Sequence, residues 1–172
     1  MSISPEPDLR AARELDEIPS PLRMREVLGH FASGVTIVTA TDLAGPAGLA
    51  CQSFHALSLS PPLVCFCVSR SSKTWPRIRI SGRFAVNILG SHQEELSHSF
   101  SRSGGDKFAG VSWSPSLLGS PLLDAAVAWV DCTIVAVYDG GDHEIVVGSV
   151  RYLDADGADP LIFFRGQYRR LA

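Results

Sequence analysis

Short apolar runs separated by turn residues dominate the chain from position 35 onward. The β-branched segment Val35–Thr41 and the segment Ala47–Ser53 flank a turn at Asp42–Pro46, which predicts a hairpin of two strands. The continuous apolar run Leu63–Val68 is typical of a strand buried on both faces. Further strands are expected at 84–89, 126–138, 144–153 and 161–164. The two long strands among these would form a hairpin around the polar turn at 139–143.

Two short helices are expected between these strands. One spans 72–81 and has a proline in its first turn, where the missing backbone N–H does no harm. The other starts at a capping box formed by Ser91 and Glu94 and runs to about Phe100. Many short strands with a few peripheral helices favour a closed antiparallel barrel over a parallel βαβ sheet.

The N-terminal segment differs from the rest of the chain. Residues 1–20 hold three prolines among scattered charges, which predicts a flexible arm before a single domain over 21–172. Ser20 and Pro21 suit a helix start as the cap and the first helical residue. Apolar residues at helical spacing extend this helix to about Ala32. These apolar residues are Met24, Val27, Leu28 and Phe31.

Composition narrows the classes of function. A chain of 172 residues can bury a substantial core, and 45% hydrophobic with 19% charged residues argues against general disorder. Fifteen basic and 18 acidic residues give a net charge of −3, which argues against nucleic acid as a partner. No apolar stretch is long enough to span a membrane and no signal peptide is visible, so a cytoplasmic location is expected.

The four cysteines give no sign of a metal site. Cys51, Cys65, Cys67 and Cys132 form neither a C-x-x-C pair nor a cluster with histidines at zinc spacing. They are expected to act as small buried hydrophobic residues, and Cys65 and Cys67 would share one face of a strand. The chain also lacks a Rossmann glycine fingerprint, a P-loop, a nucleophile elbow and a zinc-protease motif.

The region Ala47–Thr74 holds the two strongest candidates for ligand binding. At Ala50–Phe54, small side chains would let a planar ligand approach the backbone, while Gln52 and Ser53 can hydrogen-bond to its edge. At Ser69–Thr74, hydroxyls and two cations precede a helix, which favours a single phosphate. Each segment also has an ordinary interpretation, the first as a polar strand end and the second as a serine cap with solvated charges.

Three later segments could complete such a site. Lys107, in the loop after the third helix, could reach a phosphate or a partner chain, or could be an exposed turn lysine. His143 could place a neutral imidazole near a reactive ring, or could simply be exposed in its turn. The segment Arg165–Arg169 could bind a dinucleotide through charge and stacking, or could be a solvated basic tail.

Taken in order, these segments resemble the short-chain flavin reductase family of FMN-binding split-barrel proteins. The resemblance runs from about Arg23 to Tyr168 and rests on the order and spacing of several segments. They are Phe31–Thr36, Gly48–Val64, Ser81–Asn87, Asp106–Gly110, Gly119–Leu123, Gly141–His143 and Arg165–Tyr168. Residues 50–54 read Ala-Cys-Gln-Ser-Phe, where the commoner family pattern is Thr-Ala-Asn-Ser-Phe. This variant resembles the reductase components of bacterial phenol and steroid-ring hydroxylases.

The resemblance implies a mainly β fold with peripheral helices, a Greek-key split barrel that forms a homodimer with flavin near the interface. It implies an NAD(P)H-dependent flavin reductase that reduces FMN or FAD with NADH or NADPH and supplies reduced flavin to a separate monooxygenase. Gln52, Ser53 and the backbone of 54–58 would flank the flavin ring, and the segment 69–74 would hold its phosphate. His143 would be catalytic and would line the nicotinamide side together with 165–168.

The same resemblance gives the full set of residues expected to bind cofactor. They are Ser33, Gly34, Ala50, Cys51, Gln52, Ser53, Phe54, His55, Ala56, Ser58, Ser69, Ser71, Ser72, Lys73, Thr74, Lys107, Phe108, Arg165, Gly166, Gln167 and Tyr168. Two alternatives to the reductase are a flavin- or haem-binding split barrel without turnover and a flavin-dependent oxidase of a small phosphorylated amine.

Overall fold

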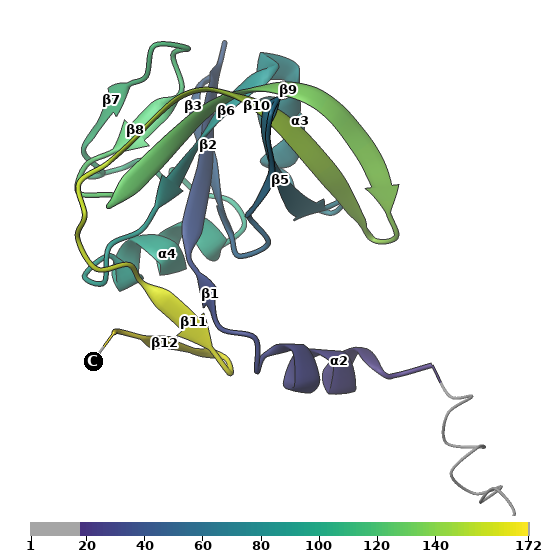
Figure 1. Ribbon diagram of the computed structural model, residues 1–172. Coiled ribbons are helices and arrows are strands. Elements are labelled where there is room, and N and C mark those ends of the chain that lie inside the picture. The colour runs from purple at the N-terminus through teal and green to yellow at the C-terminus, as the bar shows by residue number, and fades with distance from the viewer. Residues whose placement is uncertain (1–17, 172) are drawn as a thin grey trace, which may run out of the picture.

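The chain folds around one curled antiparallel sheet. In the computed structural model, which describes residues 18–171, its seven strands follow the order β3-β2-β6-β9-β10-β5-β4 (Figure 1). They are β2 (Thr36–Asp42), β3 (Gly45–Cys51), β4 (His55–Leu59), β5 (Pro62–Ser69), β6 (Arg83–Ile88), β9 (Ala128–Gly140) and β10 (His143–Ala155). The predicted hairpins β2-β3 and β9-β10 are both present.

Two small antiparallel sheets lie beside the main one, in the orders β1-β11-β12 and β7-β8. Their strands are β1 (Ser33–Gly34), β7 (Trp113–Pro115), β8 (Pro121–Leu123), β11 (Ile162–Phe164) and β12 (Gln167–Arg169). The sequence predicts only β11 of these five strands, and it does not predict the edge strand β4 of the main sheet. Segments of two to five residues show too little alternation of apolar and polar side chains to be detected.

An apolar cluster fills the inside of the curled sheet. Phe66, Phe84, Ile78 and Val146 are fully buried, and they come from β5, β6, α3 and β10. The ring of Phe66 packs edge-on against Phe84 at 5.2 Å and against Trp75 at 6.0 Å. Burying each such side chain contributes about 1.5–3 kcal/mol, so this cluster stabilises the curled sheet. A second cluster lies under α4 and contains Val35, Ile37, Leu89, Phe100, Leu123 and Leu161.

Buried polar side chains tie the β7-β8 hairpin to the main sheet. Asn87 donates from Nδ2 to the Thr39 hydroxyl at 3.1 Å and accepts at Oδ1 from the Leu123 N–H at 2.8 Å. Asp131 accepts from the Leu118 N–H at 3.1 Å. Its other carboxylate oxygen has no hydrogen-bond partner among the described residues, and burial raises the pKa of this carboxyl.

The helices are α2 (Pro21–Leu28), α3 (Trp75–Ser81) and α4 (Glu94–Ser101). Figure 1 shows α2 projecting away from the sheet on an arm, whereas α3 and α4 lie against it. As predicted, Ser20 caps α2 by accepting from the Arg23 N–H at 3.2 Å. The predicted extension to Ala32 is wrong, because the helix ends at Leu28 and Gly29 follows as its cap. Within residues 18–171 no α2 residue is buried, so the apolar face of this helix has no packing partner among them.

Other details also differ from the predictions. Strand β5 alternates between buried and half-exposed side chains, so the prediction of burial on both faces is wrong. Cys65 and Cys67 do share one face, but it is the half-exposed face of a strand next to the edge strand β4. The predicted capping box of Ser91 and Glu94 does not form. Gln93 occupies the N-cap position of α4, and its side-chain oxygen accepts from the Gly90 N–H at 2.9 Å. Of the predicted arm, positions 1–17 lie outside the described residues.

Candidate functional site

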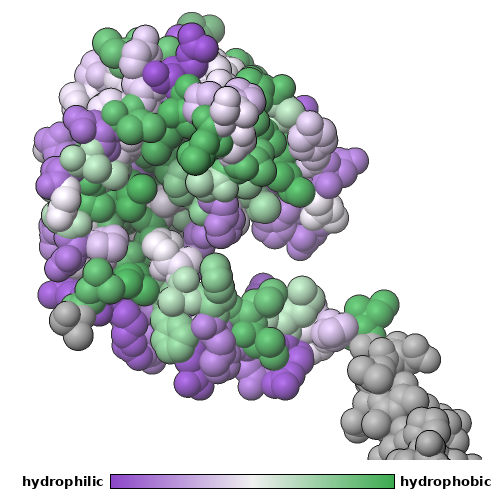
Figure 2. Space-filling model, in the orientation of Figure 1, coloured by the Kyte–Doolittle hydropathy of each residue, from purple (hydrophilic) through white to green (hydrophobic). Residues whose placement is uncertain are grey.

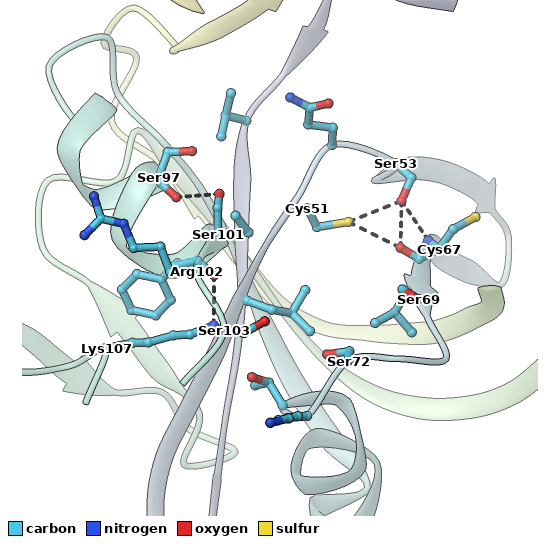
Figure 3. A pocket seen from close by; sticks show the side chains of 18 of the residues that line it. Cys51, Ser53, Cys67, Ser69, Ser72, Ser97, Ser101, Arg102, Ser103 and Lys107 are labelled. Carbon is cyan, nitrogen blue, oxygen red and sulfur yellow. Dashed lines mark hydrogen bonds between the residues drawn. The ribbon is translucent and has the colours of Figure 1, made fainter. Parts of the chain in front are cut away.

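A pocket of about 550 Å³ opens where the end of β3, the end of β5, α4 and the start of β10 meet. This size is typical of a small-molecule or cofactor site. Figure 3 shows two walls with the strands between them. One wall carries Cys51, Ser53, Cys67, Ser69 and Ser72, and the other carries Ser97, Ser101, Arg102 and Lys107.

The Ser53 hydroxyl joins the end of β3 to β5. It donates to the Cys67 carbonyl oxygen at 2.9 Å and accepts from the Cys67 N–H at 2.9 Å. The buried Cys51 thiol lies 3.3 Å from the same hydroxyl, and burial raises the pKa of this thiol. Because its single proton is already engaged, Ser53 shapes this wall of the pocket and leaves the polar edge of a ligand to Gln52 and the backbone.

The segment 69–74 forms a turn rich in hydroxyls between β5 and α3. The hydroxyls of Ser69 and Ser71 are hydrogen-bonded to each other at 2.8 Å, and the Ser72 hydroxyl accepts from the Trp75 N–H at 3.2 Å. Across residues 18–171, no hydrogen bond or ion pair engages Lys73 or the Thr74 side chain. Free hydroxyl protons beside an unengaged ammonium suit an anion, because charge-assisted hydrogen bonds are the strong ones.

The opposite wall is held by Lys107. Its ammonium donates to the carbonyl oxygens of Gly48 at 3.2 Å and Phe100 at 2.9 Å, and so joins β3, α4 and the loop that follows. Burial lowers the pKa of Lys107. Only glycine fits at position 48, because a Cβ there would lie 2.5 Å from the Phe100 ring. The close approach of β3 to α4 thus sets the width of the pocket.

His143 and Tyr168 line the same pocket from different elements, His143 beside Ser69 at the start of β10 and Tyr168 on β12 against α4. The His143 Nδ1 lies 2.7 Å from a carboxylate oxygen of Asp142, and this hydrogen bond lowers the pKa of Asp142. A proton on Nδ1 leaves Nε2 of the neutral ring as an acceptor. The hydroxyls of Tyr168 and Ser97 are hydrogen-bonded at 2.8 Å, and the Tyr168 ring packs edge-on against Phe163 at 5.3 Å.

A cluster of charges fixes the hairpin tip that carries His143. Glu144 accepts from the buried Trp75 Nε1–H at 2.5 Å and from Arg79 at 3.3 Å. Arg70 donates to Glu144 at 3.4 Å and to the Gly141 carbonyl oxygen at 3.1 Å, and it also pairs with Asp139. The cluster therefore connects the β9-β10 turn to the hydroxyl-rich turn 69–74.

Residues 28–172 match a family model described as "Flavin reductase like domain". The chain belongs to the flavin reductase family. It is 48% identical to the flavin-dependent monooxygenase reductase subunit HsaB of Mycobacterium tuberculosis over 151 residues, covering 86% of this chain and 81% of that protein. It is 38% identical to an NADH-dependent flavin reductase of Rhodococcus sp. over 169 residues, covering 93% and 92%.

A solved structure of a flavin reductase gives the same result for the fold. The NADH:FAD oxidoreductase SgcE6 of Streptomyces globisporus, in complex with NAD and FAD fragments, matches with a TM-score of 0.85 and 35% identity. The match covers 91% of this chain and 97% of that one. The predicted family and the predicted mainly β split-barrel fold are therefore confirmed, and the predicted flavin and nicotinamide cofactors agree with these relatives.

The pocket of this flavin reductase family member brings together more than half of the residues predicted for the site. They are Ala50, Cys51, Gln52, Ser53, Ser69, Ser71, Ser72, Lys73, Thr74, Lys107, His143 and Tyr168. Ser33, Gly34, Phe54 and His55 line an adjacent cavity of about 270 Å³, which shares Gln52 with the main pocket. Phe108 lines a cavity next to Lys107, and Gly166 and Gln167 line a shallow cavity next to Tyr168. Ala56, Ser58 and Arg165 are not among the residues that line these cavities.

The α4 wall of the pocket was missed by the sequence analysis. Ser97, Ser101, Arg102 and Phe163 line the pocket but were not predicted to do so. Ser97 and Ser101 stand four apart on one helix face, and this spacing was the one signal available in the sequence. Across residues 18–171, no group of three or more His, Cys, Asp or Glu could hold a metal ion, and no helix is long and apolar enough to cross a membrane.

Proposed function

We propose that this chain is an NAD(P)H-dependent flavin reductase that reduces FMN or FAD and supplies the reduced flavin to a separate monooxygenase. The observation that supports this most strongly is the pocket itself, which gathers hydroxyls, a free ammonium and an imidazole in a chain of the flavin reductase family. A relative that shares 48% of its residues is the reductase subunit of a flavin-dependent monooxygenase.

The donor set fits a flavin. Gln52 and the backbone at the end of β3 would flank the polar edge of the ring, and Cys51 packs behind them as a small apolar residue. Ser72, Lys73 and Thr74 would bind the phosphate, because their hydroxyl protons and ammonium are not used up by contacts within residues 18–171. The pocket volume of about 550 Å³ lies in the range of cofactor sites.

His143 and Tyr168 would hold the nicotinamide against the ring, since both line the pocket. Hydride transfer from nicotinamide to flavin would be supplied by the two cofactors when bound, and the chain's own residues would contribute placement. His143 would orient the reacting groups through Nε2, since Nδ1 is held by Asp142. Tyr168, fixed by Ser97 and Phe163, would exclude water from the stack.

We further propose that the protein is a homodimer in which α2 packs on a second copy. Leu22, Val27, Leu28 and Phe31 are 77%, 50%, 62% and 71% exposed, and Figure 2 shows a hollow between the barrel and the arm that carries α2. The cavity between Phe31 and Phe54 opens on this side and shares Gln52 with the pocket. A contiguous apolar surface of this kind marks an interface, and the second copy would complete the wall next to the flavin ring.

Light scattering of the purified protein tests the dimer. Leu28→Glu should convert a dimer into a monomer, because it places a charge in the apolar face of α2. Leu117→Glu, at a side chain that is 79% exposed in the β7-β8 loop, is the matched control and should leave the dimer intact. A wild-type monomer at micromolar concentration, or equal behaviour of the two variants, would refute the proposed interface.

Steady-state kinetics with each pair of NADH or NADPH and FMN or FAD test the enzymatic function. The proposal predicts oxidation of at least one nicotinamide nucleotide that depends on added flavin. Tight binding of flavin with no turnover for any pair would instead identify a protein that carries or senses flavin.

A further inference from the structure

The cation Arg70 belongs to the hydroxyl-rich turn 69–74, but its side chain points away from the pocket. Its neighbours Ser69 and Ser71 both line the pocket, whereas Arg70 is absent from the lining. Its guanidinium instead faces the β9-β10 hairpin, where Nε donates to the Gly141 carbonyl oxygen at 3.1 Å. One of the two cations that the sequence places at the expected phosphate site therefore serves another purpose.

The tip of this hairpin lies beyond the paired part of β5 and β10. His143 pairs with Ser69 in the last register position between the two strands, and Gly141 and Asp142 lie outside it. The side chains of His143 and Asp142 are 44% and 93% exposed, so packing alone does not fix them. The orientation of the imidazole therefore depends on hydrogen bonds, beginning with the 2.7 Å contact between its Nδ1 and the Asp142 carboxylate.

Arg70 contacts the tip of the hairpin at four points. Its backbone N–H donates to the Asp142 carbonyl oxygen at 3.0 Å, and its Nε donates to the Gly141 carbonyl oxygen. Its Nη1 donates to Glu144 at 3.4 Å, and its Nη2 pairs with Asp139. These acceptors lie on both sides of the imidazole in the chain. A guanidinium is planar and rigid, so it can hold several acceptors in one fixed arrangement, which the ammonium of a lysine does not do.

We propose that Arg70 is a positioning residue, which holds the His143 imidazole in place for its action on the nicotinamide and binds neither cofactor. The inference rests on the proposed function, because it takes His143 to act on the nicotinamide. The Arg70 side chain is 43% exposed, so its ion pairs contribute little to the stability of the fold. Its contribution is to geometry, and a displacement of about 1 Å in a positioning group can slow a reaction by about a hundredfold.

A double-mutant cycle with His143 tests this assignment. The measured quantity is the rate of flavin reduction in stopped flow, with saturating nicotinamide nucleotide. Arg70→Ala should lower this rate by about tenfold to a hundredfold. In the His143→Ala background the same substitution should change the rate by less than about twofold, because the ring that Arg70 positions is gone. Equal effects of Arg70→Ala in the two backgrounds would overturn the proposal.

Flavin binding separates positioning from phosphate binding. Arg70→Ala should leave the dissociation constant of FMN within about twofold of the wild type, because the turn keeps the hydrogen bonds between Ser69 and Ser71 and between Ser72 and Trp75. Weaker binding of FMN with unchanged binding of riboflavin, which has no phosphate, would make Arg70 a phosphate ligand and overturn the proposal.

Two control variants separate geometry from charge. Arg79 pairs with the same Glu144 carboxylate at 3.3 Å and is 56% exposed, but within residues 18–171 no hydrogen bond or ion pair joins it to the turn 139–143. Arg79→Ala should therefore leave the rate of reduction within about twofold of the wild type. Arg70→Lys should keep most of the loss, because its ammonium lacks the planar fork. Full recovery by lysine, or an equal loss in Arg79→Ala, would overturn the proposal.

Nitrogen NMR of the imidazole gives a readout that needs no cofactor. At about pH 8.5, where an imidazole is ordinarily neutral, the His143 ring of the flavin-free wild type should carry its proton on Nδ1. Arg70→Ala should show a mixture of the two tautomers, and Arg79→Ala should resemble the wild type. An unchanged His143 spectrum in Arg70→Ala would overturn the inference.

The wild-type protein separates failure of this inference from failure of the proposed function. Absence of flavin-dependent oxidation of NADH and NADPH by the wild type would overturn both. Turnover by the wild type, with equal effects of Arg70→Ala in the two His143 backgrounds, would overturn the inference alone.

Discussion

Replacement of Glu144 by alanine should destabilise the protein and misplace the His143 hairpin. The carboxylate accepts a 2.5 Å hydrogen bond from Trp75, whose side chain is buried, and the loss of such a bond to a charged group costs about 1.5–3 kcal/mol. The side chains of Arg70 and Arg79 are 43% and 56% exposed, so water solvates both guanidinium groups once the carboxylate is removed. The loss of each ion pair therefore adds only about 0–1 kcal/mol to the cost. Glu144→Ala should therefore lower the free energy of unfolding by about 1.5–5 kcal/mol.

Glu144→Gln is the matched control for this prediction. The amide oxygen still accepts from Trp75 and only the charge is lost, so the cost should be about 1 kcal/mol. Urea unfolding followed by tryptophan fluorescence gives both values. Because the cluster positions both His143 and the turn 69–74, kcat/KM for the nicotinamide nucleotide and the affinity for flavin should both fall in the alanine variant. Equal unfolding midpoints for the two variants, or for Glu144→Ala and the wild type, would refute the reasoning.

Three other predictions follow from the pocket and the core. His143→Ala should slow flavin reduction in stopped flow while changing the flavin dissociation constant little; an unchanged rate of reduction would show that this imidazole has no part in the reaction. Thr74→Val should raise the dissociation constant of FMN by about tenfold to a hundredfold, the loss of one charge-assisted hydrogen bond, and should not affect riboflavin, which has no phosphate. Equal losses for the two ligands would contradict a phosphate site at this turn. Burial raises the pKa of Asp131 above its unfolded value, so its charge costs stability as pH rises through the folded pKa. Since asparagine keeps an oxygen for the Leu118 N–H, Asp131→Asn should unfold at higher urea than the wild type at about pH 8, with the gap closing toward about pH 4.

The elements that sequence predicts well here are those with a local cause. The β2-β3 hairpin follows from β-branched residues on either side of a turn, and α3 follows from Pro76 in its first turn. The start of α2 follows from Ser20, but its end does not, because the spacing of Val27 and Phe31 reflects an apolar face that residues 18–171 leave exposed. Periodicity shows that a face is apolar and leaves open what covers it.

The parts that sequence could not give depend on contacts between distant segments. The Ser53 hydroxyl looks free for a ligand until β5 brings Cys67 within 2.9 Å of it. Likewise, Lys107 reads as a turn lysine until the packing of α4 on β3 places the Gly48 carbonyl oxygen 3.2 Å away. The wall that contains Ser97 and Tyr168 exists only because β12 pairs with β11, and three residues are too few for a strand signal.

Anaerobic reduction of excess flavin by NADH tests the central claim most directly. With FMN or FAD in large molar excess over the protein, the account predicts that flavin reduction continues far beyond one flavin per chain, with NADH and flavin consumed in equal amounts. Reduction that stops after one flavin per chain, or that does not occur with NADH or NADPH, would contradict a flavin reductase that releases its product.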